Sequence, residues 1–209
     1  MTTPRNPKPE GLRARKRRAT ENAIESSAVK LSLEKGVANV TVEEICEMAD
    51  ISRSTFFNYF AGRDYAIVGR AVDLPDDASA FAILDSAADD LPRGIFRLLF
   101  AGMGHTNVNS EVARLRQRLV EEQPQAARMM MSTLMETTYR LTGIGIAWLT
   151  SHPEHARTAD PAREVSLAVT LVTGVIVVQM RKWAAAEGDV QATEEDFDLV
   201  MEEYRIFLP

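Results

Sequence analysis

Residues 41–64 constrain the fold of this chain more than any other segment, because they hold two short helical patterns separated by a sharp turn. The first pattern opens with a capping box, in which the Thr41 hydroxyl is placed for the backbone N–H of Glu44 and the Glu44 carboxylate reaches back. We expect a positive φ at Asp50, since Asp tolerates this conformation better than most non-glycine residues. Ser52 is suited to cap the second helix. The segment therefore predicts a helix-turn-helix.

The two helices of this unit have distinct inner and outer faces. The predicted buried stripe of the first helix is Ile45, Met48 and Ala49. In the second helix, Phe56 and Phe60 lie one turn apart and are predicted to face the core. The side chains that must then point elsewhere are Arg53, Ser54, Phe57 and Asn58. Such a face suits a DNA major groove, because it supplies donors for base edges and phosphates and an apolar contact for the thymine methyl.

The stretch resembles the DNA-binding domain of the tetracycline-repressor (TetR) family of bacterial transcription regulators. The matching residues are Thr41, Ile45, Ala49, Ser52, the run Thr55-Phe56-Phe57-Asn58-Tyr59-Phe60, and Arg63 with Asp64. The resemblance covers roughly the first third of the chain. It departs from the family at Asp50, where Gly is usual, and at Phe57, where Tyr is common. These departures imply a slightly strained turn and the loss of a phosphate-contacting hydroxyl.

The resemblance implies an all-α protein with two domains. Residues 1–73 would form a three-helix, helix-turn-helix DNA-binding domain with a basic N-terminal arm, and residues 74–209 a helical bundle for ligand binding and dimerisation. Position within the motif places Arg53 and Asn58 at base edges and Phe57 against a base or sugar. The residues assigned to phosphates are Thr41, Ser54, Tyr59 and Arg63, and Ser52 and Thr55 complete the predicted DNA-binding set from the motif.

Charge is divided unevenly along the chain. The net charge is −6, yet residues 1–70 hold 12 Lys and Arg against 9 Asp and Glu, a net +3, and the remainder holds 12 against 21, a net −9. Residues 1–10 contain three prolines and are expected to be a disordered arm. Arg15, Arg17 and Arg18 lie in the first turns of the next predicted helix, where positive charge opposes the helix dipole. Phosphate binding accounts for this cluster, and a solvated, frayed helix end is the alternative.

Helical periodicity continues through most of the chain. The predicted helices span about residues 12–35, 63–72, 91–105, 110–122 and 124–150, followed by an apolar helix from Pro161 to Gly188 and a last helix capped at Thr193. The Ala-rich segment before Asp90 has too weak a pattern to assign. No strand is predicted.

A stripe of Met and aromatic residues in the second domain is a candidate site for a small hydrophobic ligand, since Met fills irregular space adaptably. Its members are Phe100, Met103, Met131, Met135, Tyr139 and Trp148. The alternative is that these residues form ordinary core. His152 and His155 are too poorly placed around Pro153 for a metal pair, so no metal is expected. The chain shows no catalytic constellation and no phosphate loop, so we expect neither enzymatic activity nor a cofactor.

The two C-terminal helices are the predicted homodimer interface, because the apolar helix has more hydrophobic faces than one subunit covers, and Gly174 allows close approach. The uncharged run within it is too short for a comfortable membrane span. A single Cys and no apolar leader favour the cytoplasm. Together with these features, the resemblance to the TetR family implies a dimeric repressor that binds a palindromic operator and is released by a small hydrophobic ligand. The alternatives are a transcriptional activator, and a ligand-binding or interaction module with a purely structural helix-turn-helix.

Overall fold

The computed structural model describes residues 11–70, 72–103 and 107–206, and the expected N-terminal arm lies outside this part of the chain. The helices begin and end where hydrophobic periodicity and caps place them in most cases, and the fold is all-α as predicted. Their bounds are α1 (Leu12–Lys35), α2 (Val42–Met48), α3 (Arg53–Tyr59), α4 (Arg63–Val68), α5 (Asp77–Asp85), α6 (Leu91–Met103), α7 (Ser110–Glu122), α8 (Pro124–Ser151), α9 (Pro161–Ala185) and α10 (Glu194–Arg205), with 3-10 turns η1 (Val37–Asn39) and η2 (Pro153–His155).

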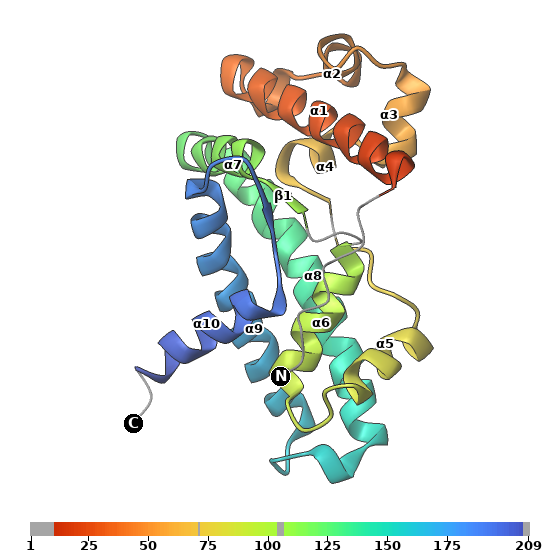
Figure 1. Ribbon diagram of the computed structural model, residues 1–209, viewed down its shortest axis with the longest axis vertical. Helices are drawn as coiled ribbons and strands as arrows, with labels where there is room; N and C mark the ends of the chain where they lie inside the picture. Colours follow the sequence, from red (N-terminus) through yellow and green to blue (C-terminus); the bar gives the residue numbers. More distant parts are fainter. Residues whose placement is uncertain (1–10, 71, 104–106, 207–209) are drawn as a thin grey trace.

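Helices α1–α4 form a head at one end of the molecule (Figure 1). Its core includes Ile24, Phe56 and Phe60, each at most 1% exposed. The same hydrophobic cluster continues into Leu119 of α7 and Ala126 of α8. The core of the head is therefore continuous with parts of α7 and α8. The predicted division of the chain into two domains between residues 73 and 74 stays a proposal.

The remaining helices form a body below the head, with α8 running along its length and α9 beside it (Figure 1). Its core cluster is built from α5, α6, α8, α9 and α10 around Ile95, Leu98, Trp148, Val169 and Phe197. The last helix, α10, extends from one side of the body (Figure 1).

Several local features differ from the sequence predictions, and the apolar helix predicted to reach Gly188 ends at Ala185. The helix expected over residues 63–72 ends at Val68, because Gly69 adopts φ 103°. Met48 is 46% exposed rather than part of the buried stripe, since α2 has only two turns and its buried residues are Ile45 and Cys46. The unassigned Ala-rich segment contains α5, whose first turn is capped by the Asp76 carboxylate accepting the Ser79 N–H at 2.9 Å.

The expectation that the chain has no strand is wrong. Two three-residue strands, β1 (Asn107–Asn109) and β2 (Asp189–Gln191), pair antiparallel with Val108 opposite Val190. Strands this short carry no detectable alternation of polar and apolar residues. The pairing joins the start of α7 to the connection between α9 and α10.

Helix α9 is long and apolar enough to cross a membrane by length and composition, with a mean hydropathy of 1.6 in its most apolar window. A core helix of a soluble protein meets the same criteria. One face of α9 is buried inside this fold through Val165, Val169 and Val172. The length and hydropathy of this one helix are therefore weak evidence for a membrane span.

Candidate nucleic-acid interface

The helix-turn-helix is shaped by local hydrogen bonds that the sequence predicts. Thr41 and Glu44 form the capping box, with the Glu44 N–H donating to Thr41 Oγ1 at 3.2 Å and the Thr41 N–H donating to Glu44 Oε2 at 3.0 Å. The hydrogen bond from Lys35, followed by those from Thr41, lowers the pKa of Glu44. Asp50 has φ 52°, as expected for the turn. Ser52 Oγ accepts the Thr55 N–H at 3.1 Å and so caps α3.

Helix α3 is anchored by its aromatic inner face. Phe56 and Phe60 are buried, with ring centroids 6.0 Å apart, whereas Phe57 is 46% exposed and meets Phe56 edge-on. Arg53, Ser54 and Asn58 are also exposed. The structure thus brings the predicted base-contacting residues onto one solvent-facing side of a short, well-anchored helix, as a major-groove reader requires.

Arg53 contacts two neighbouring side chains. Its guanidinium forms an ion pair with the Glu43 carboxylate of α2, and its Cζ lies 5.6 Å from the Phe57 ring centroid. The side chains of Arg53 and Glu43 are 66% and 62% exposed. Sequence reasoning missed Glu43, because an acid in the first turn of a helix is ordinarily explained by the helix dipole alone. A base contact through Arg53 Nη1 would compete with Glu43 for this nitrogen.

Arg63, assigned to a phosphate, has internal partners. Its Nη1 donates to the Val40 carbonyl at 2.7 Å, and its Nε contacts Asp64 Oδ1 at 3.0 Å. The side chain is 29% exposed. Arg63 therefore links the start of α4 to the segment before α2. Its contact with a DNA phosphate stays a prediction.

The basic start of α1 lies beside α3. Arg17 Cζ stands 6.0 Å from the ring centroid of Tyr59, so the fold brings two predicted DNA-binding groups together from different helices. Arg15 and Arg17 are exposed and Arg18 is partly buried. Positive charge thus continues from the exposed face of α3 towards α1, which matches a surface that follows a phosphate backbone.

Cys46 lies behind this surface, buried in the head core. Burial, and then the nearby Glu43 carboxylate, raises the pKa of its thiol. A buried thiol with a raised pKa behaves as a small hydrophobic residue.

Residues 24–64 match the family model described as bacterial regulatory proteins, tetR family. Residues 24–64 thus carry a tetR-type DNA-binding domain. A second match is the HTH-type transcriptional regulator TcmR of Streptomyces glaucescens, 38% identical over 63 residues, which are 30% of this chain and 26% of TcmR. The match thus spans about a quarter of that relative.

Two solved structures resemble the whole chain weakly. A TetR-family transcriptional regulator from Mesorhizobium loti has a TM-score of 0.38 and 18% identity, with 90% of this chain and 92% of that one covered. RolR in complex with resorcinol has a TM-score of 0.30 and 24% identity, with 83% of each chain covered. The similarity to tetR-family regulators therefore lies in the head.

The six candidate ligand residues do not meet in one cavity. Met131, Met135 and Tyr139 are 57%, 41% and 71% exposed, one turn apart along the outside of α8. Trp148 is 1% exposed and donates its indole N–H to Asp85 Oδ1 at 2.8 Å. The partly buried Phe100 packs on Phe96, with ring centroids 4.4 Å apart, and Met103 is also partly buried at the end of α6. The spacing of hydrophobic residues predicted that these six residues lie on helices. It could not show which face of each helix is buried, because that depends on the packing of neighbouring helices.

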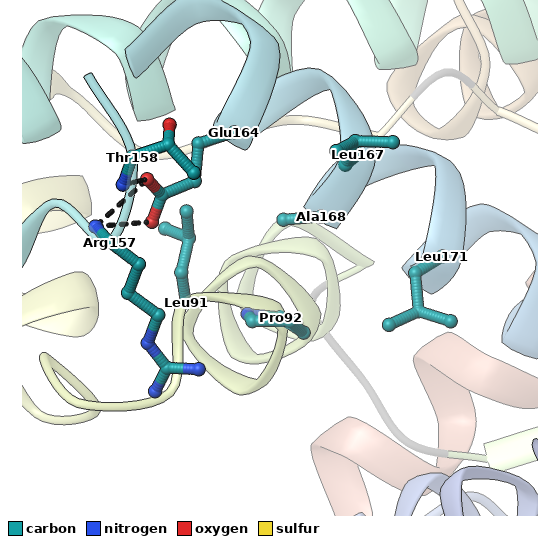
Figure 2. A pocket seen from close by; sticks show the side chains of 8 residues that line it. All are labelled: Leu91, Pro92, Arg157, Thr158, Glu164, Leu167, Ala168 and Leu171. Atoms are coloured by element: carbon teal, nitrogen blue, oxygen red, sulfur yellow. Dashed lines mark hydrogen bonds between the residues drawn. The ribbon is translucent and has the colours of Figure 1, made fainter. Parts of the chain in front are cut away.

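A cavity of about 250 Å³ lies between the start of α6 and the start of α9. Figure 2 shows its lining, which contains none of the six candidates: Leu91, Pro92, Arg157, Thr158, Glu164, Leu167, Ala168 and Leu171. The Glu164 carboxylate accepts the backbone N–H groups of Arg157 and Thr158, at distances of 2.8 to 3.1 Å (Figure 2). The Glu164 carboxylate is thus hydrogen-bonded to the loop before α9, and the rest of the cavity lining is mainly apolar.

His152 and His155 both contact Trp148. Their rings stack on the indole with centroid distances of 5.2 Å and 5.6 Å. Within the described part of the chain, no group of three or more His, Cys, Asp and Glu side chains could hold a metal ion. The two histidines therefore pack the end of α8 in this structure.

Proposed function

We propose that this protein is a transcriptional regulator that binds double-stranded DNA sequence-specifically, with α3 in the major groove. The observation that carries the proposal is the solvent-facing side of α3, where Arg53, Phe57 and Asn58 stand together on a helix of a tetR-type domain. Arg53 at the start of the helix is suited to a bidentate contact with guanine, and Asn58 to adenine. The basic turns of α1 supply charge for the phosphates.

A dimer that reads a palindrome is part of the proposal. Exposed apolar side chains gather on α9 and α10, including Leu167, Val178 and Leu199, which are 62%, 46% and 49% exposed. Their burial against a second copy would remove apolar area from water. Gly174, expected to admit a partner helix, faces Tyr204 of α10, because an added Cβ would lie 2.8 Å from its hydroxyl. Because Tyr204 covers Gly174, the proposed dimer interface uses the exposed side of α9 before and after Gly174, at Leu167 and Val178.

Sedimentation velocity tests this interface. Leu167→Glu and Val178→Glu introduce charge at exposed positions and should shift the dimer towards monomer without unfolding the chain. Ser166→Glu, exposed on the same helix, is the matched control. A monomeric wild-type protein, or variants that dimerise as tightly as the control, would count against the interface.

The proposed regulator is a cytoplasmic repressor released by a small hydrophobic ligand. The exposed apolar row of Met131, Met135 and Tyr139 on α8 supports a ligand surface, because single exposed apolar residues are common but a row of three is not. Ligand binding would act by favouring a head arrangement that no longer matches successive major grooves. A screen of hydrophobic compounds by thermal shift, repeated with Met135→Gln, tests the site.

Selection from a random duplex library at one fixed salt concentration tests the central proposal. Wild-type protein should enrich an inverted repeat, and its affinity should fall steeply with salt. Arg53→Ala should relax sequence preference, whereas Tyr59→Phe should weaken binding to all sequences alike. A folded dimer that enriches no sequence would favour the alternative of a structural helix-turn-helix, and increased transcription from the operator would identify an activator.

A further inference from the structure

Helix α7 carries two arginines, Arg114 and Arg116, that reach the ends of two different helices. Arg116 donates from Nε to the Ile67 carbonyl at 2.9 Å and from Nη2 to the Ala66 carbonyl at 3.1 Å, both in the last turn of α4. Arg114 donates from Nε to the Ala184 carbonyl at 3.1 Å and from Nη2 towards the Ala186 carbonyl at 3.3 Å, at the end of α9. Residues two positions apart on a helix point to nearly opposite sides. A single turn of α7 thus joins the head to α9.

The Arg116 contact is well enclosed. Its Nη2 also forms an ion pair of 2.8 Å with Glu25 of α1, and the two side chains are 14% and 15% exposed. The last carbonyls of a helix lack partners within the helix, and a cation there interacts favourably with its dipole. Arg116 therefore fixes both the end of α4 and the middle of α1 relative to α7.

Contacts at the two ends of α7 also link this helix to the head and to the segment after α9. At its start, Ser110 Oγ donates to the Gly188 carbonyl, and β1 pairs with β2, so α7 is bound to the segment after α9. Just beyond its end, Gln123 accepts the Val37 N–H at 2.9 Å and donates to the Ser32 carbonyl at 2.7 Å, so it is bound to the head. These hydrogen bonds and the shared core around Leu119 make α7 a strut between the head and α9.

We propose that Arg114 and Arg116 are positioning residues that set the distance between the two recognition helices of the dimer. The inference rests on the proposed function, because the spacing matters only if two copies meet through α9 and bind one operator. A recognition helix in each of two successive major grooves must be separated by about 34 Å. Loosening either arginine would let the head swing relative to α9 while leaving the DNA-contacting face of α3 unchanged.

Selection for half-site spacing tests the proposal. The library holds the enriched half-site in inverted repeats whose spacer varies by single base pairs, and the proteins are wild type, Arg116→Gln, Arg114→Gln and the control Arg118→Gln. Arg118 lies on the same helix, is 63% exposed, and forms an ion pair along α7 with Glu122. Wild type and control should prefer one spacer by on the order of tenfold, and the two test variants should reduce that preference to about threefold or less. A purely structural role would instead lower affinity at every spacer alike, which would overturn the proposal.

A distance measurement independent of DNA separates the proposal from the function on which it rests. Spin labels at Asn58→Cys in α3 and Ser166→Cys in α9, in a Cys46→Ala background and diluted with unlabelled chain, report the distance between head and α9. The distribution should widen in Arg116→Gln and Arg114→Gln and stay narrow in Arg118→Gln. If the distance distribution widens in the two test variants but no operator is enriched, the regulator function is refuted and the role of α7 as a strut is retained. If all distributions are equally narrow and an operator is enriched, only the role of α7 as a strut is refuted. Arg114 is at the surface, so its variant tests the proposal even if Arg116→Gln fails to fold.

Discussion

Replacing Glu43 by Gln should strengthen DNA binding. The Glu43 carboxylate accepts a hydrogen bond from Arg53 Nη1, and we expect Arg53 to exchange this partner for a base in the complex. Both side chains are more than three-fifths exposed, and an ion pair this exposed contributes about 0.2–1 kcal/mol. Releasing Arg53 should therefore raise operator affinity by about 1.5-fold to fivefold.

Removal of a negative charge near DNA would also raise affinity, so the measurement needs a matched control. Glu47 lies one turn further along α2 and is exposed, and Glu47→Gln removes the same charge without touching the Arg53 contact. Fluorescence anisotropy with the selected operator, at a fixed ionic strength of about 0.1 M, would compare the two. The excess effect of Glu43→Gln should disappear in an Arg53→Ala background, which isolates the pair as a double-mutant cycle.

Two results would refute this reasoning. Equal gains from Glu43→Gln and Glu47→Gln would mean that only general electrostatics is involved. A loss of affinity would mean that Glu43 orients Arg53 productively for its contact with the base, so that the ion pair persists in the complex.

Three further predictions concern stability, measured by urea unfolding followed by circular dichroism. Phe56→Ala should destabilise the head by about 3–5 kcal/mol, because the ring is fully buried and leaves a cavity; a loss under 1 kcal/mol would contradict the packing. Thr41→Ala should cost about 0.5–2 kcal/mol through loss of the α2 cap, and Thr41→Ser should restore most of it. The hydrogen bond from Arg97 lowers the pKa of Glu194 below its ordinary value of 4.5, so its contribution to stability is present above pH 4.5 and is lost as the pH falls through the lowered value. Glu194→Gln should flatten the dependence of the unfolding free energy on pH in that acidic range, and an unchanged slope would show that the contact with Arg97 adds nothing.

Local chemistry made the head predictable. The Thr41 capping box, the positive φ at Asp50, the Ser52 cap and the buried pair Phe56 and Phe60 all depend on residues at most four positions apart. Interactions of this range are encoded in spacing alone, so the sequence by itself determined the helix-turn-helix, its resemblance to the tetR family and the outward face of α3.

Contacts between distant segments decided the rest. The pairing of Arg53 with Glu43, the internal use of Arg63 and the reach of Arg116 to α4 depend on where whole helices pack. The same holds for the candidate ligand residues, since only packing leaves Tyr139 exposed while it buries Trp148. Helical periodicity shows that a stripe exists but not what covers it, because burial of a face is a property of the neighbouring elements. The tertiary structure alone therefore decided which charged groups are engaged within the chain and how the head is held on the body.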